Sequence, residues 1–230
     1  QSYPRTQKAD ADKAALKKMS AELRGQLEPY YDRPFDSSND DVVVRLRKYG
    51  TTDYVFAVND NRKFGKYVGQ YGLVMEEGVP SQAVVSVRRE KGYIYDLVAG
   101  KEVAGAGDKN WLRINKDFGA AEGSLWMVTE KQIKEVKIDL PAKAKRGGSF
   151  KIGITVADSQ GKAIDAVVPV NVEITNASGA IMEYSGYYGA KDGVLNIKYD
   201  ASLKDEPGTW RIKVKELASG KTGEGRISLQ

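Results

Sequence analysis

The sequence of 230 residues contains no cysteine and no histidine. The chain therefore has no disulfide, no thiolate or imidazole metal ligand, and no Ser-His-Asp or Cys-His nucleophile pair. It also has no run of about 18 consecutive apolar residues, the length that a membrane-spanning helix requires. These absences leave Asp/Glu acid–base chemistry, a lysine nucleophile and calcium held by oxygen ligands as the chemistry open to it.

Basic and acidic residues nearly balance, with 36 Lys and Arg against 31 Asp and Glu and a formal net charge of +5. The basic residues are spread along the chain, whereas a nucleic-acid-binding protein gathers them on one face with aromatic residues between them. We interpret the charges as solvated surface and expect no nucleic-acid partner. A hydrophobic content of 41% is typical of a globular protein, and the length fits two domains or one large all-β domain.

One segment, 12–27, has the pattern of an amphipathic helix. Leu16, Met19 and Leu23 recur at spacings of three to four residues, and Pro29 ends the pattern. The opposite face is basic. Because this apolar stripe needs a surface to cover it, we expect it to bind an upstream domain of the same polypeptide or another protein.

After this helix the sequence consists of short strand-like runs separated by Gly, Asn and Asp. In the first part the runs are 42–47, 54–58, 83–87, 93–98, 111–114 and 124–128. In the second part, apolar and polar residues alternate in 150–156, 169–174, 193–199, 208–214 and 225–229. The pattern predicts a mainly β chain of two antiparallel β-sandwich domains, 1–130 and 131–230, preceded by one N-terminal amphipathic helix. Seven or so strands in about a hundred residues indicate that the second sandwich is immunoglobulin-like.

The second domain contains four short motifs, at 145–150 (Lys-Arg-Gly-Gly-Ser-Phe), 156–164, 168–172 and 205–210 (Asp-Glu-Pro-Gly-Thr-Trp). With them, 131–230 resembles the macroglobulin-like sandwich module of large secreted or periplasmic bacterial proteins. The resemblance implies a spacer and an interaction surface, in a periplasmic or extracellular location. The thioester chemistry of some macroglobulin proteins requires a cysteine, so it is excluded here.

The first domain resembles the C-terminal β-domain that follows the catalytic barrel of large multidomain bacterial glycoside hydrolases. The motifs that carry this resemblance are 54–60, 93–103 and 117–126, together with the glycine-rich stretch 64–72. It implies a place in a larger, carbohydrate-active architecture. We therefore expect the chain to be part of a longer exported protein.

Catalysis by this segment is not expected. Glycoside hydrolysis requires two carboxylates about 5 to 10 Å apart across a cleft. Glu76 and Glu77 are adjacent and would point to opposite faces of a strand, and the other candidates are Asp96 and Glu122. No motif for a cofactor is present, so none is expected.

Two further groups of residues could bind a ligand. Asp36, Asp40 and Asp41 offer oxygen ligands for calcium but lack the EF-hand spacing, so a solvated loop is the favoured interpretation and no metal site is expected. Exposed tyrosine rings suit stacking on sugars or protein partners, unless they fill sandwich edges instead. The candidate tyrosines are Tyr184, Tyr187 and Tyr188 in one cluster, and Tyr67 and Tyr71 in the glycine-rich stretch.

The sequence thus predicts a non-catalytic structural and interaction region that acts as a spacer and protein-binding surface. One alternative is a carbohydrate-binding module that uses the exposed tyrosines to hold a polysaccharide. A second alternative is a structural subunit that assembles with copies of itself.

Overall fold

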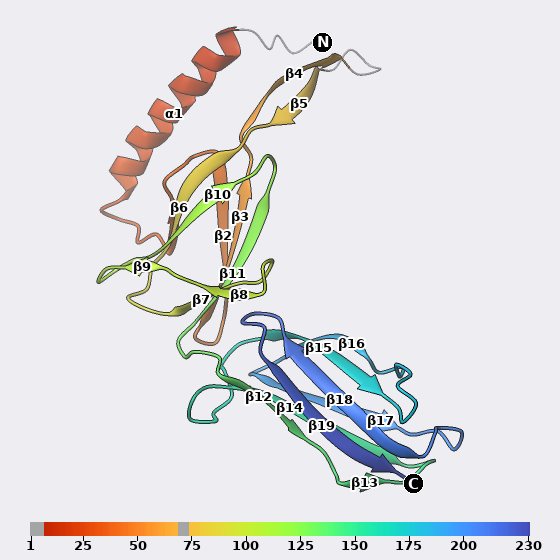
Figure 1. Ribbon diagram of the computed structural model, residues 1–230. Helices are drawn as coiled ribbons and strands as arrows, with labels where there is room; N and C mark the ends of the chain where they lie inside the picture. Colours follow the sequence, from red (N-terminus) through yellow and green to blue (C-terminus); the bar gives the residue numbers. More distant parts are fainter. Residues whose placement is uncertain (1–6, 69–73) are drawn as a thin grey trace. The chain divides into compact units, whose positions relative to one another are not determined.

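A computed structural model describes residues 7–68 and 74–230 (Figure 1). Within these residues the chain is mainly β with a single helix and several antiparallel sheets, which confirms the predicted fold class. The helix α1 spans Gln7–Leu27, and it includes the predicted segment 12–27. No helix in the described residues is long and apolar enough to cross a membrane.

The chain forms two compact units. The first consists of the described residues up to Leu46 together with 55–91 and 105–124, and the second consists of 47–54, 92–104 and 125–230. The second unit therefore contains the predicted domain 131–230 and also two earlier segments of the chain. The predicted boundary near residue 130 stays a prediction.

The first half of the chain supplies three sheets. One has the strand order β1-β6-β10-β9, with the bounds Phe35–Ser37 (β1), Ser81–Val87 (β6), Leu112–Phe118 (β10) and Ala106–Gly107 (β9). Another pairs β4 (Arg62–Val68) with β5 (Val74–Gly78). The third, β2-β3-β11-β7-β8, contributes residues to both units and comprises Val42–Tyr49, Thr52–Asn59, Gly123–Thr129, Tyr93–Asp96 and Lys101–Val103.

Two sheets make up the sandwich of the second unit. The smaller has the order β12-β14-β17, with the bounds Glu135–Asp139, Ser149–Ala157 and Val194–Asp200. The larger has the order β13-β19-β18-β15-β16, with the bounds Lys143–Ala144, Thr222–Leu229, Gly208–Glu216, Val168–Thr175 and Gly186–Ala190. Neighbouring strands are antiparallel except for β13, which runs parallel to β19.

Strict alternation fixes which side chains of these strands form the core. Along β18, Trp210, Ile212 and Val214 are buried, while the residues between them are exposed. Successive side chains of a strand point to opposite faces, so one face of β18 lies on the core and the other faces solvent. Trp210 packs edge-on against the ring of Tyr199, with 5.5 Å between the ring centres.

Segment 47–54 is attached to this sandwich by hydrogen bonds. The Tyr54 hydroxyl donates to the carbonyl of Val167 and accepts from its amide, each over 2.8 Å. The Thr52 hydroxyl donates to the carbonyl of Asp165 over 2.7 Å, and the Asp165 carboxylate accepts from the Thr51 amide over 2.8 Å. These bonds explain why 47–54 belongs to the second unit.

Two fully buried tyrosines of the second unit differ in how their hydroxyls are satisfied. The Tyr95 hydroxyl accepts a hydrogen bond of 2.8 Å from the amide of Ile133. The Tyr199 hydroxyl is buried without a hydrogen-bond partner among the described residues. Burying an unbonded hydroxyl costs free energy, whereas removing one partner of a buried hydrogen bond leaves the other unpaired.

The same substitution at these two sites should therefore have opposite effects. Tyr199→Phe is expected to raise the free energy of unfolding by up to about 1 kcal/mol, and Tyr95→Phe to lower it by about 1 to 3 kcal/mol. Urea unfolding followed by tryptophan fluorescence measures both. A loss of stability in Tyr199→Phe equal to that in Tyr95→Phe would show that the Tyr199 hydroxyl is bonded after all.

Candidate functional site

The outer face of the larger sheet in the second unit is polar and rich in basic residues. It consists of the side chains that alternate with the core residues of its strands, and we call it the basic face. Strand pairing places its residues in four rows: Tyr187, Asn171, Lys215 and Thr222; then Glu173, Lys213 and Glu224; then Thr175, Arg211 and Arg226; then Thr209, Ser228 and Lys143. With five Lys and Arg against two Glu, the basic face has a formal net charge of +3.

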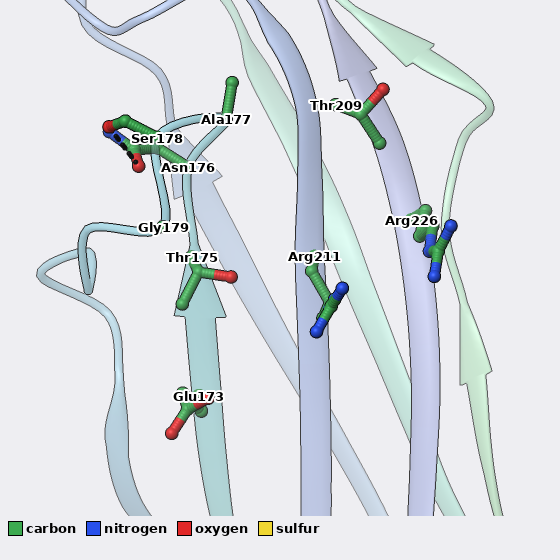
Figure 2. A pocket seen from close by; sticks show the side chains of 9 residues that line it. All are labelled: Glu173, Thr175, Asn176, Ala177, Ser178, Gly179, Thr209, Arg211 and Arg226. Atoms are coloured by element: carbon green, nitrogen blue, oxygen red, sulfur yellow. Dashed lines mark hydrogen bonds between the residues drawn. The ribbon is translucent and has the colours of Figure 1, made fainter.

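Two arginines lie directly opposite each other on this face. Arg211 of β18 and Arg226 of β19 are cross-strand partners (Figure 2). Glu224 Oε1 lies 3.3 Å from Arg211 Nε and 3.3 Å from Arg226 Nη2. One carboxylate is therefore shared by two guanidinium groups.

A hollow of about 500 Å³ lies beside the two arginines. Its lining residues come from β15, β18, β19 and the loop that follows β15: Glu173, Thr175, Asn176, Ala177, Ser178, Gly179, Thr209, Arg211 and Arg226. The Asn176 side chain holds this loop, because its Oδ1 accepts from the Ala180 amide over 2.7 Å and from the Ser178 hydroxyl over 3.0 Å. Ser178 is held a second time by its amide, which donates to Glu206 Oε2 over 3.1 Å.

The three clustered tyrosine candidates are separated by the fold. Tyr187 is 79% exposed and lies on the basic face opposite Asn171. Tyr188 is half-buried, and its hydroxyl donates to the carbonyl of Tyr184 over 2.8 Å. The ring of Tyr184 in turn packs against the buried Tyr199, with 4.8 Å between ring centres. Tyr187 is thus free to contact a ligand, while Tyr184 and Tyr188 contribute to packing.

This difference gives a prediction for stability. Tyr187→Ala is expected to change the free energy of unfolding by less than about 0.5 kcal/mol, and Tyr188→Ala to lower it by about 1 to 3 kcal/mol because ring packing and a hydrogen bond are lost. Thermal unfolding of the two variants, side by side, measures this. Equal midpoints would contradict the assignment of Tyr188 to packing.

The other two tyrosine candidates fall in the glycine-rich stretch. Tyr67 lies on β4, but the structure does not describe its side chain. Tyr71 lies outside the described residues. They remain candidates from the sequence.

The apolar stripe of α1 is exposed to solvent within the described residues. The exposed fractions of Leu16, Met19 and Leu23 are 60%, 59% and 53%. Two neighbouring basic residues of the helix form ion pairs instead, Lys17 with Asp41 over 3.3 Å and Arg24 with Asp36. The stripe is thus available to a partner, and its binding to one stays a prediction.

Two of the calcium candidates contact cations of the chain itself. Asp36 binds Arg24 and also Arg33, the latter over 2.8 Å, while Asp40 is exposed. Asp41 is ion-paired with the helix as described above. Among residues 7–68 and 74–230, no group of three or more acidic side chains is placed to hold a metal ion.

The carboxylates considered for glycoside hydrolysis each contact other groups of the chain. Their partners are Arg62 for Glu76, Lys63 for Glu77, the amides of Val98 and Ala99 for Asp96, and Lys116 for Glu122. The hydrogen bond from Lys116 lowers the pKa of Glu122, and the Gly119 amide lowers it further. A general acid in such hydrolysis instead requires a raised pKa.

The arginine pair was not found by sequence reasoning. Arg211 and Arg226 each occupy an outward position in a strand that the alternation predicted, but which residues face each other depends on the pairing register. The register follows from the turn between β18 and β19. In it, the buried Glu216 side chain accepts hydrogen bonds from the amides of Ala218, Ser219 and Lys221.

Comparison with known proteins does not assign the chain to a family. No family model matches it, and no curated protein matches it. Among solved structures it is similar to a superoxide reductase (neelaredoxin) from Ignicoccus hospitalis, with 10% identity, a TM-score of 0.31, and coverage of 43% of this chain and 82% of that one. It is also similar to the adhesin InvE of Yersinia pseudotuberculosis, with 10% identity, a TM-score of 0.35, and coverage of 85% of this chain and 60% of that one. Similarities at this level carry no argument about function.

Proposed function

We propose that this chain is a non-catalytic structural and interaction region of a larger exported bacterial protein, and that it binds a protein partner through the basic face. In this proposal the second unit is an immunoglobulin-like, macroglobulin-like sandwich that serves as spacer and docking surface. The observation that carries it is the basic face itself: a sheet surface with a formal charge of +3 that contains Tyr187 and two arginines. A partner with an acidic surface fits this charge.

The types of residue on this face support a protein partner. Tyrosine and arginine are enriched at the residues that contribute most to protein–protein binding. Tyr187 and Arg211 are aligned with Asn171 and Thr175, four residues apart on β15, which corresponds to about 13 Å along the strand. This separation places both residues within one interface of ordinary size.

Carbohydrate binding is the second candidate, because Tyr187 presents an exposed ring. Self-assembly is the third, because β16 is the last strand of its sheet and an open strand edge can pair with another chain. Both alternatives use the β16 side of the sheet. We favour a separate protein partner because an acidic protein surface would use Tyr187 and the arginines together.

Selection from a library of random displayed peptides, on the whole chain, tests the proposal. We expect the selected peptides to be rich in Asp and Glu, and to lose binding to the Lys213→Glu/Lys215→Glu variant. A matched control is Lys151→Glu/Lys198→Glu, the same charge change at a cross-strand pair of exposed lysines in the smaller sheet. Peptides that bind both variants equally would contradict docking at the basic face.

A further inference from the structure

We propose that the Arg211–Arg226 pair and its hollow form a binding site for carboxylate groups of an acidic peptide segment. This inference rests on the proposed function and names the chemistry that the basic face recognises. The proposed ligands are Asp or Glu side chains of a protein partner. Binding of an acidic polysaccharide instead is one possible result of the experiments described below.

The two arginines form a like-charge pair across neighbouring strands. Like charges placed directly opposite each other on neighbouring strands destabilise a sheet. Here a single carboxylate, that of Glu224, contacts both guanidinium groups, so these three side chains together carry one positive charge. Glu173, the acidic residue that lines the hollow, forms no ion pair with either arginine among the described residues. A second carboxylate, supplied by a ligand, would neutralise this positive charge.

Both arginines keep nitrogens that the ion pairs with Glu224 do not use. Arg211 contacts Glu224 through Nε and Arg226 contacts it through one terminal nitrogen, and no other ion pair of either residue is present among the described residues. The side chains of Arg211 and Arg226 are 56% and 64% exposed, so a ligand can reach them. Guanidinium groups donate two parallel hydrogen bonds to a carboxylate, which gives geometric selectivity as well as attraction.

Residues with hydroxyl groups line the hollow together with the arginines. Thr175 lies opposite Arg211 on β15 and its hydroxyl points toward that arginine, while Thr209, two residues before Arg211 on β18, lines the hollow farther along the strand (Figure 2). Both hydroxyls can bond a carboxylate or a peptide backbone. None of the nine lining residues is aromatic, so the hollow offers no ring on which a sugar could stack. This composition favours an acidic peptide over a polysaccharide.

A titration of the full chain with hexaglutamate, capped at both ends, tests the inference. The arginine Nε–H signals in two-dimensional NMR report on the site directly. We expect the signals of Arg211 and Arg226 to shift with hexaglutamate and not with capped hexaglutamine. We also expect the shifts to weaken as salt is added, because exposed charges are screened.

Variants that keep the charge separate a specific site from general attraction. Arg211→Lys/Arg226→Lys should weaken hexaglutamate binding about tenfold, because lysine lacks the planar pair of donors. Lys215→Gln, which removes a charge from the same face outside the hollow, should weaken it much less. Unchanged binding by the double lysine variant, with an unchanged thermal midpoint, overturns the inference.

Glu224 supplies an independent check. Glu224→Gln removes the carboxylate that competes for the arginines and should strengthen hexaglutamate binding severalfold. Glu135→Gln makes the same charge change on β12 and should have little effect. An equal gain in both variants would indicate net charge alone and would overturn the site.

The outcomes also separate this inference from the proposed function. Tighter binding of trigalacturonate than of hexaglutamate would overturn the peptide assignment in favour of a polysaccharide. Failure of hexaglutamate to shift either arginine overturns the site, even if displayed peptides still require Lys213 and Lys215. If the NMR signals of the two arginines shift with hexaglutamate but the peptide selection yields no binding peptide, the carboxylate site is supported and the proposed function is contradicted.

Discussion

Between pH 10 and about pH 12, the second unit is expected to lose several kcal/mol of folding free energy as two buried tyrosines titrate. Burial raises the pKa of Tyr95 from 10.0 to about 12, and burial likewise raises the pKa of Tyr199 to about 12. Both side chains are fully buried by the fold.

The sign follows from proton binding. Above pH 10 the unfolded chain releases the protons of both phenols, while the folded chain keeps them until about pH 12. The folded state therefore binds more protons in this window. Its stability is fully present below pH 10 and falls as the pH rises.

Urea unfolding at a series of alkaline pH values measures this loss. The Tyr95→Phe/Tyr199→Phe variant is the control, because it removes both phenols, and its stability should vary less with pH in the same window. An equal slope in the wild type and in the double variant would show that other groups cause the alkaline loss.

Replacing Gly193 with alanine is expected to lower the free energy of unfolding by more than about 3 kcal/mol. Gly193 has a φ of +70° and follows Asp192, which also has a positive φ of 54°, in the turn enclosed by the bridge partners Lys191 and Val194 between β16 and β17. A Cβ at this position would lie 2.7 Å from the backbone nitrogen and oxygen of Ile164 and 2.9 Å from the carbonyl of Val156. Because all three atoms belong to backbone, the packed sandwich would have to shift to accept it.

Gly179 provides a matched control for this substitution. Its φ of +87° is equally unfavourable for alanine, but no atom lies within 4 Å of the position a Cβ would occupy. Gly179→Ala is expected to cost only about 1 kcal/mol, the penalty of the backbone conformation alone. Thermal or urea unfolding of both variants measures the difference, and equal losses would refute close packing around Gly193.

Regular alternation made part of the fold predictable from the sequence. The helix at 12–27 and the strand around Trp210 follow from periodicity, because the apolar residues recur at the spacing of one helix face or one strand face. Glu216 continues the inward series of Trp210, Ile212 and Val214, yet it is an acidic residue. Its burial depends on turn amides that the pattern does not show.

The candidate site was harder to predict because it depends on contacts between distant segments. In 183–189 the sequence groups three tyrosines, but only the pairing of β16 with β15 shows that Tyr187 faces outward while Tyr188 packs inward. The arginine pair likewise exists only in one register of β18 and β19. Neither the outward orientation of Tyr187 nor the arginine pair can be derived from residue type alone.

The hydrogen bonds of Tyr54 and Tyr95 affect how the sandwich of the second unit could be transferred to another protein by gene fusion. Both hydroxyls satisfy backbone groups in 131–230, those of Val167 and Ile133. A gene fusion that transferred only the stretch encoding 131–230 would leave these two amides without their acceptors. The second unit consists of three segments, 47–54, 92–104 and 125–230, so a fusion protein that is to keep these hydrogen bonds has to include all three.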